Sequence, residues 1–98
     1  MISKKMVEAL NDQICAETYS AYLYLAMSAY GTNIGLKGAG QWFFVQTQEE
    51  ITHALRIYNY LIKQAALVVL KALEQPPSTF KSLLDMYEKA LKHEKYIT

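Results

Sequence analysis

A few acidic side chains and one histidine stand where a helical sequence pattern calls for apolar residues. Glu50 and His53 are three residues apart, and Glu17 and Glu94 occupy equivalent places in two other segments. Carboxylates buried together repel one another and are costly to desolvate unless they are paired or bind a cation. A metal dication relieves both problems. Mixed carboxylate and imidazole ligands suit iron or manganese, and zinc can also enter. We therefore predict a metal site.

The weight of this prediction lies in the combination of these residues. A Glu-x-x-His pattern alone is common and usually marks a solvated helix face. Adding Glu17 on a second helix strengthens the case for a metal site, and Glu94 on a third makes coincidence a poor explanation. Two or more such helices facing inward build a dinuclear carboxylate site.

Two residues beside these ligands have alternative interpretations. Tyr24 lies two turns after Glu17 on the same stripe. It is either a core tyrosine with a satisfied hydroxyl or a hydrogen-bond partner of a metal ligand. Gln46 lies one turn before Glu50 and is either a similar partner or a polar core residue.

Two further polar residues lie next to the predicted ligands. Glu49 is one step off the stripe that contains Glu50, so it is either solvated or serves an adjacent, accessory metal position. His93 is rotated by about 100° from Glu94 around a helix. For His93 we expect a surface role.

Three helices must position these residues, and they are expected near residues 4–30, 38–65 and 83–98. In each of them, residues on one stripe recur at alternating spacings of three and four, which is typical of helices facing a partner. Ser3 is the expected cap of the first helix, and Ser82-Leu83-Leu84-Asp85 resembles a capping box at the start of the third. All four glycines fall between residues 31 and 40, where they predict a break between two helices.

The connection from Gln64 to Ser82 is long for a helical bundle. Its length would let the chain travel back along the second helix before the third begins. Val68, Val69 and Leu70 are apolar, so this stretch is expected to rest on another part of the molecule.

Length and composition indicate one all-α domain spanning residues 1–98. Apolar residues make up 52% of the chain and charged residues 19%, which excludes a disordered protein. The net charge is +1 with no basic stripe, so we expect no nucleic-acid partner.

The same sequence argues for a cytoplasmic protein that has no membrane partner. Cys15 is the single cysteine and cannot form an internal disulfide, and the first residues show no signal-peptide core. The stretch Thr18–Leu36 is uncharged and has 19 residues, close to a bilayer span. It contains several hydroxyl side chains and lacks basic flanks, so a helix buried in an assembly is the better interpretation.

At the level of whole motifs, the sequence resembles the non-haem ferritins of bacteria and archaea. The resemblance is carried by residues 5–14, by Glu17 with residues 19–25, by residues 35–38, 42–43, 45–46 and 48–50 with His53 and Ala54, and by residues 72–74, 76–78 and 90–94. It implies a ferritin-like bundle with a di-iron ferroxidase centre, which oxidises Fe(II) with dioxygen or peroxide for iron storage and detoxification. The implied iron ligands are Glu17, Glu50, His53 and Glu94.

The resemblance also assigns neighbouring residues. Tyr24 corresponds to a tyrosine beside the family's iron site, and Glu49 to a ligand of an accessory iron position. Bacterioferritins bind haem through a methionine just after the residue equivalent to Glu50. Ile51 stands there, so no haem is expected.

Several positions depart from the family pattern. Family chains continue past the position of Thr98 with the rest of the third helix and a fourth helix, so the resemblance implies a truncated chain. Gly31 and Ala39 stand where aromatic residues are usual, and Phe44 where a basic residue is usual. Ala65-Ala66 replaces a Gly-Gly pair that normally ends the second helix, which suggests that this helix runs on.

Self-association would complete a four-helix bundle. Two hairpins related by a two-fold axis could share Glu17, Glu50 and His53, an arrangement that leaves the place of Glu94 in doubt. We expect an obligate oligomer, at least a dimer. Its inward residues would be Ile14, Ala21, Phe43 and Ile57, and further apolar surface at Tyr19, Tyr22, Leu25 and Phe44 suggests larger assemblies. The alternative function is a truncated or engineered ferritin-derived assembly module without ferroxidase activity.

Overall fold

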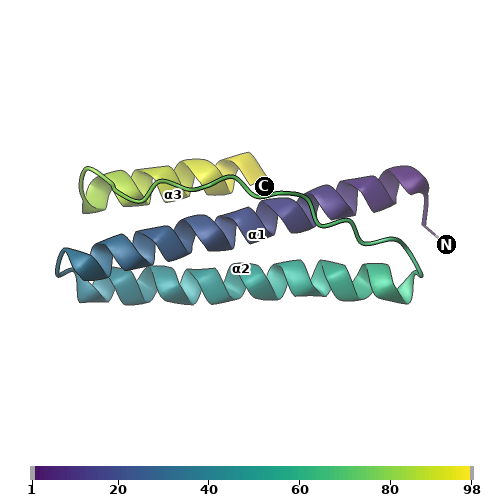
Figure 1. Cartoon of the computed structure of the whole chain (residues 1–98), viewed down its shortest axis with the longest axis horizontal. Helices are drawn as coiled ribbons and strands as arrows, with labels where there is room; N and C mark the ends of the chain where they lie inside the picture. The colour runs from purple at the N-terminus through teal and green to yellow at the C-terminus, as the bar shows by residue number, and fades with distance from the viewer. Residues whose placement is uncertain (1, 98) are drawn as a thin grey trace.

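The structure, a computed structural model, describes residues 2–97 and consists of three helices, α1 (Lys4–Asn33), α2 (Lys37–Lys63) and α3 (Leu83–Ile97). No strand occurs among these residues. The prediction of an all-α architecture is confirmed. α1 and α2 form a long antiparallel hairpin, and α3 lies along α1 over the half of the hairpin that contains the α1–α2 turn (Figure 1).

The glycine-rich segment is mostly helical rather than a loop. Only Gly35, with φ of 88°, lies in the turn, whereas Gly31 falls within α1 and Gly40 within α2. A Cβ on Gly31 would lie 3.4 Å from the backbone nitrogen of Gly40, and Ser28 Oγ donates to the Gly40 carbonyl at 2.7 Å. The glycines therefore allow the two backbones to approach, and α1 continues three residues beyond the expected Tyr30.

The predicted caps of α1 and α3 are present. Ser3 Oγ accepts from the Met6 N–H at 3.1 Å, and Ser82 Oγ accepts from the Asp85 N–H at 3.1 Å. The Asp85 carboxylate accepts from the backbone N–H of Lys81 at 3.0 Å, which lowers the pKa of Asp85. These bonds satisfy N–H groups that a helix start leaves without partners.

The end of α2 differs from the expected run-on helix. The last helical residue is Lys63, and Ala65 adopts a left-handed conformation with φ of 53°. The Ala65 N–H bonds to the Ile62 carbonyl and the Ala66 N–H to the Leu61 carbonyl, both at 3.0 Å. This is the Schellman pattern of a helix end, which usually has glycine at the left-handed position.

The crossover, residues 64–82, runs back along α1 and not along α2 as expected. The Asn11 side chain donates to the Leu67 carbonyl at 2.9 Å and accepts from the Val69 N–H at 2.8 Å. Further along, the Tyr30 and Phe80 rings lie 5.6 Å apart. Val68 packs on the core as expected, whereas Leu70 is 78% exposed.

Two hydrophobic clusters form the core. The three-helix cluster draws on both hairpin helices, the crossover and α3. The two-helix cluster lies nearer the N-terminus, where the crossover replaces α3. The buried members are Leu23, Tyr24, Met27, Phe43, Phe80, Met86 and Ala90 in the first, and Ile14, Ala54 and Leu61 in the second.

The burial expected for the helix seam arises within one chain. Ile14, Ala21 and Phe43 are buried, and Ile57 is partly buried against the two-helix cluster. Burial of these four residues therefore needs no second copy. Of the surface residues expected to favour association, Tyr22, Leu25 and Phe44 are exposed, whereas Tyr19 packs against the three-helix cluster. No helix in the described part of the chain has the length and apolarity needed to cross a membrane.

Candidate metal centre

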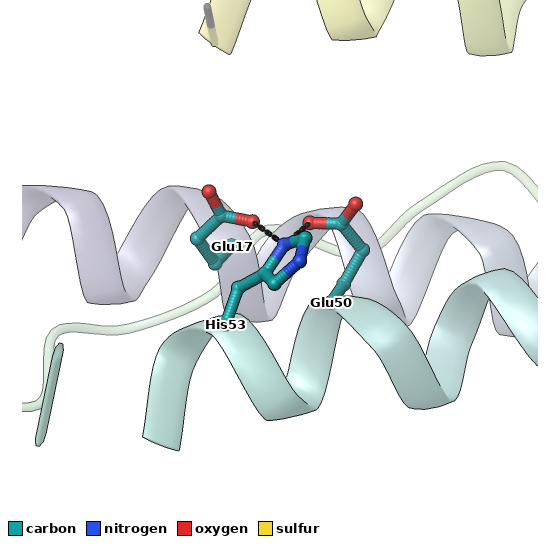
Figure 2. A group of neighbouring side chains, drawn as sticks. All are labelled: Glu17, Glu50 and His53. Carbon is teal, nitrogen blue, oxygen red and sulfur yellow. Dashed lines mark ion pairs between the residues drawn. The ribbon is translucent and has the colours of Figure 1, made fainter. Parts of the chain in front are cut away.

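Glu17 on α1 converges with Glu50 and His53 on α2 in the middle of the hairpin (Figure 2). One ligand atom from each residue lies within 4.8 Å of the others. Glu50 and His53 share a helix face because they are three residues apart, and the antiparallel packing of α1 brings Glu17 to the same level. The structure thus brings together three of the four predicted ligands.

The histidine lies between the two carboxylates. His53 Nδ1 is 3.6 Å from Glu17 Oε2 and 3.7 Å from Glu50 Oε2. The Glu50 side chain is 7% exposed and that of Glu17 is 12% exposed, whereas the His53 side chain is 46% exposed. The site is therefore buried on the carboxylate side and reachable from solvent past the imidazole.

The two carboxylates lack compensation inside the hairpin. Glu17 Oε2 and Glu50 Oε2 are buried and have no hydrogen-bond partner within the described chain. Burial raises the pKa of Glu50 to about 8, and the neighbouring charges of Glu17 and Glu94 act in the same direction. Burial also opposes ionisation of Glu17, but its interactions with Glu50, Gln13 and His53 outweigh burial and lower the pKa of Glu17. The geometry leaves an acidic site short of positive charge.

Gln13 is a site residue that the sequence analysis missed. Its Nε2 donates to Glu17 Oε1 at 2.9 Å from one turn earlier on α1. This bond fixes one oxygen of Glu17 and leaves Oε2 directed at the site. The spacing of four residues before a predicted ligand was the available signal.

Glu94 reaches the same region from α3. The Tyr24 hydroxyl donates a hydrogen bond to the Glu94 carboxylate. Burial, and then this bond, raise the pKa of Tyr24. Glu94 lies outside the group of three converging ligands but close enough to act on the pKa of Glu50. Of its two interpretations, Tyr24 thus has the geometry of a hydrogen-bond partner to a predicted ligand.

The two flanking candidates on α2 stand apart from the converging group. Gln46 is partly buried one turn before Glu50, and Glu49 is exposed. Neither contributes an atom to the group formed by Glu17, Glu50 and His53 in the described chain. An accessory role for Glu49 remains a prediction.

His93 does not have the surface role expected for it. Its Nε2 lies 2.6 Å from Ser20 Oγ, and its ring packs edge-on against the rings of Tyr19 and Tyr24. Burial lowers the pKa of His93. The pattern around Glu94 did not reveal this contact because α3 packs on α1 with two adjacent residues facing inward.

The arrangement fits a hard or borderline cation. It offers carboxylate oxygens and one imidazole nitrogen, a donor set suited to iron, manganese or zinc. The two buried oxygens without partners are the atoms that a cation would satisfy. A bound dication would also offset the burial and the neighbouring negative charges that raise the pKa of Glu50.

Known proteins provide close comparisons. The profile of the ferritin-like domain matches residues 7–98. The chain is 44% identical over 98 residues to the bacterial non-heme ferritin of Campylobacter jejuni and covers 59% of that protein. It is 35% identical to a bacterial non-heme ferritin of Bacteroides fragilis, of which it covers 62%.

Solved structures agree with the sequence comparison. An open pore ferritin from the archaeon Archaeoglobus fulgidus superimposes with a TM-score of 0.96 and 48% identity, covering 99% of this chain and 60% of that one. The fold of α1, α2 and α3 is therefore the fold of the corresponding part of a longer protein. The present chain spans about 60% of the length of these relatives.

Proposed function

This chain belongs to the ferritin family, and from that premise we propose that it binds Fe(II) at Glu17, Glu50 and His53 and oxidises it to Fe(III) for storage or detoxification. Iron is here the substrate and cargo. The proposal covers a pair of iron ions, with dioxygen or peroxide as the electron acceptor.

One observation carries this proposal: two buried carboxylate oxygens have no hydrogen-bond partner among the described residues and lie beside a histidine nitrogen. A purely structural pair would be satisfied by a donor, as buried polar atoms generally are. Gln13 already serves the other oxygen of Glu17, so Oε2 is kept available. A cation is the partner that this geometry lacks.

Each ligand would have a role that follows from its position in the site. Glu50 is influenced by both Glu17 and Glu94, so we assign it to be shared by the two ions. Because its pKa is raised to about 8, it would release a proton on metal binding near neutral pH. Anionic oxygen ligands favour the ferric product over the ferrous substrate, which supplies part of the driving force for oxidation.

Residues around the site would support the entry of iron and the binding of further ions. The half-exposed His53 offers a path for iron from solvent, and the exposed Glu49 beside it is our candidate for an accessory ion. Tyr24 would hold Glu94 in place for the second ion. Ile51 has no ligand atom, so haem is not part of the proposal.

The decisive experiment is anaerobic Fe(II) titration followed by oxygen exposure, read by calorimetry and by the absorbance of Fe(III). We expect Glu50→Ala and His53→Ala to abolish binding of the ion pair, because each removes a ligand from the converging group. Glu94→Ala should weaken binding of the second ion and leave the first in place. Glu88→Ala, on the exposed surface of α3, is the matched control.

Three results would separate the possibilities. Unchanged iron binding in all ligand variants would show that the metal site is misassigned. Loss of oxidation with retained binding would favour a binding protein without ferroxidase activity. Equal damage from Glu94→Ala and Glu50→Ala would exclude a site shared between two symmetric hairpins, in which α3 takes no part.

The alternative function, an assembly module without iron oxidation, rests on the openness of the site. His53 is 46% exposed, and the group whose ligand atoms lie within 4.8 Å of one another has three members among the described residues. Protein that associates but neither binds nor oxidises iron in the titration would support this alternative.

Self-association is part of the proposal, and the position of α3 limits its geometry. The contacts of Ser20 with His93 and of Tyr24 with Glu94 place α3 against the side of α1 that faces the site. A second hairpin could share Glu17 from that side only if α3 left. Association is therefore better sought on another surface.

A further inference from the structure

A cavity of about 420 Å³ opens where the end of α3 lies close to α1 and the crossover (Figure 1). Its volume falls within the usual range of small-molecule sites. None of the three converging carboxylate and imidazole ligands lines it, so it is separate from the candidate metal centre. We call it the crossover cavity; its charged and aromatic lining residues are Asp12, Tyr19, Lys71, Glu74, His93 and Tyr96.

Three aromatic rings line the crossover cavity in succession. The Tyr19 and His93 rings meet edge-on with centroids 5.6 Å apart, and the His93 and Tyr96 rings are stacked with centroids 6.5 Å apart. Tyr19 packs against the three-helix cluster and His93 Nε2 lies 2.6 Å from Ser20 Oγ, so both rings are fixed before a ligand arrives. Tyr96 is 85% exposed, which leaves its ring able to adjust to a ligand. Aromatic faces carry partial negative charge and attract cations, most strongly where water is excluded.

The charged residues of the crossover cavity carry a net negative charge. Asp12 is ion-paired with Lys71, and these two charges cancel. Glu74 is exposed and forms no ion pair within residues 2–97. At about pH 8 an ordinary histidine is uncharged, so Glu74 supplies the charge that remains. The cavity therefore offers aromatic faces and one carboxylate to a ligand with a single positive charge.

A neighbouring hollow shows which side of the rings a cation would favour. It has a volume of about 310 Å³ and is also lined by Tyr19, His93 and Tyr96, but its charged residues are Lys89 and Lys92. A cation is repelled on the side of these lysines and attracted on the side of Glu74. The same aromatic groups thus have opposite electrostatic surroundings on their two sides.

Inorganic metal ions and anions fit the crossover cavity poorly. A metal dication needs several converging lone pairs, and among the described residues only Glu17, Glu50 and His53 form such a group of three. An anion would meet the Glu74 carboxylate without a cation to offset it, because Lys71 is already paired. An organic ammonium needs no such set of lone pairs, because ring faces attract its charge and contact its methyl groups.

We propose that the crossover cavity binds a small organic monocation, a substituted ammonium of the choline type, between the three rings and the Glu74 carboxylate. The ligand would contact α1, the crossover and α3 at once. Binding would therefore hold the end of α3 against the hairpin, since a ligand that binds only the docked arrangement stabilises it. The proposal goes beyond iron binding and does not depend on it.

The first experiment compares two probes of the same shape in metal-free protein at about pH 8. Choline carries a quaternary ammonium, and 3,3-dimethylbutan-1-ol has a carbon atom in place of the nitrogen. We expect calorimetry to show saturable binding of choline, about tenfold tighter than binding of the neutral alcohol. Equal binding of both probes would identify an apolar pocket without preference for charge. That result, or the absence of saturable choline binding, would overturn the proposal.

Substitutions then locate the bound cation. Glu74→Gln keeps the shape of the side chain and removes its charge, so choline should bind about threefold more weakly. Tyr96→Leu removes a ring face and should weaken binding by a similar factor, whereas Tyr96→Phe should stay within about twofold of the wild type. Tyr60→Leu, at an exposed position on α2 outside the cavity, is the control. Wild-type affinity in either Glu74→Gln or Tyr96→Leu would contradict the proposal, once circular dichroism has shown that the variant is folded.

Competition with Mn(II) separates this site from the candidate metal centre. We expect Mn(II) to leave choline binding unchanged, because the two sites share no lining residue. Displacement of choline by Mn(II) would place the ammonium at the metal centre and refute the proposal. Choline binding in protein that does not bind Mn(II) would instead contradict only the iron site.

Hydrogen exchange tests whether the ligand joins α3 to the hairpin. At a choline concentration ten times the Kd, backbone amides of α3 near His93 should exchange about tenfold more slowly. Amides near Lys37, at the opposite end of the hairpin from the N-terminus, are the internal reference. Choline binding without slower exchange in α3 would show that the ligand does not bridge the two and would count against the proposal.

Discussion

The half of the hairpin near the α1–α2 turn is covered by α3, whereas the half toward the N-terminus is covered only by the extended crossover. In the three-helix half, Met27, Phe43 and Met86 are fully buried. In the two-helix half Leu61 is fully buried as well, but Val7, Leu10 and Ile57 are only partly buried. There, side-chain hydrogen bonds from Asn11 hold the covering segment in place.

The candidate metal centre lies between these two halves. On α1, Glu17 stands between Ile14 of the two-helix cluster and Leu23 of the three-helix cluster; on α2, Glu50 falls between Phe43 and Ala54. The site thus has packed side chains on one side and solvent access on the other. This difference explains how carboxylates can be buried while the adjacent imidazole stays half-exposed.

The largest expected effect is on the contact that closes the three-helix half. In Gly40→Val, the new Cβ would overlap the Thr32 hydroxyl and approach the Ser28 carbonyl to 3.1 Å. We expect the free energy of unfolding to fall by about 3 kcal/mol. Urea unfolding followed by circular dichroism measures this change.

The matched control is Gly38→Ala, also in α2, whose Cβ would meet nothing within 4 Å. It should stabilise the protein by about 0.5–1 kcal/mol, because alanine is the better helix former. Equal losses in both variants would show that helix propensity, not close packing, decides the outcome.

A smaller loss is expected in the two-helix half. Asn11→Ala removes the bonds to Leu67 and Val69 and leaves backbone groups of the crossover without partners. We expect destabilisation of about 2 kcal/mol. Hydrogen exchange should accelerate at the Val69 amide and stay unchanged at amides near Met27. Acceleration in both places would mean that the two halves unfold as one unit.

At the candidate metal centre, which lies between the two halves, we expect the free energy of unfolding of the metal-free protein to depend on pH. The folded-state pKa of Glu50, about 8, exceeds the ordinary value of 4.5, so the folded state holds this proton more tightly. The free energy of unfolding should therefore fall as the pH rises from 4.5 through 8, because the ionised form of Glu50 is disfavoured in the folded state. The lowered pKa of Glu17 acts below 4.5 and does not mask the effect.

Glu50→Gln is the control for the expected change in stability over this pH range. It cannot ionise, so its stability between pH 5 and pH 8 should be flatter than that of the wild type, as followed by urea unfolding with chelator present. A wild-type profile as flat as that of Glu50→Gln would contradict the raised pKa.

The smallest effect is expected at the end of α2 in the two-helix half. Ala65→Gly relieves a left-handed backbone with φ of 53° and should raise the free energy of unfolding by about 1 kcal/mol. Ala66→Gly, one residue on, should destabilise instead, since Ala66 packs against the two-helix cluster. Thermal unfolding of both variants distinguishes them.

The periodic pattern of apolar residues predicted the positions of the helices and the residues that share one helix face. Helix position and the convergence of Glu17, Glu50 and His53 follow from residues three, four or seven apart, because side chains at those spacings share one face. Resemblance added the expected ferritin-like role of Glu94. Whether these residues ligate iron stays a prediction of the sequence.

The features that sequence alone did not predict depend on packing between segments. The cluster of glycines predicts a break between helices, yet Gly31 and Gly40 lie within α1 and α2 and permit a close contact between them. The path of the crossover is set by the Asn11 side chain, whose partners lie more than fifty residues away. The inward position of His93 likewise depends on the angle at which α3 meets α1.

The path of the crossover also sets an order of assembly. The Ser28–Gly40 bond joins residues 12 apart in sequence, whereas Tyr24 and Glu94 are separated by 70. Contacts that close short loops form before those that close long ones, because less chain entropy is lost. The hairpin, with Glu17, Glu50 and His53 in place, should therefore form before α3 delivers Glu94. If the proposed function holds, an iron ion present during folding would meet three of the proposed ligands first, and the docking of α3 would add the fourth.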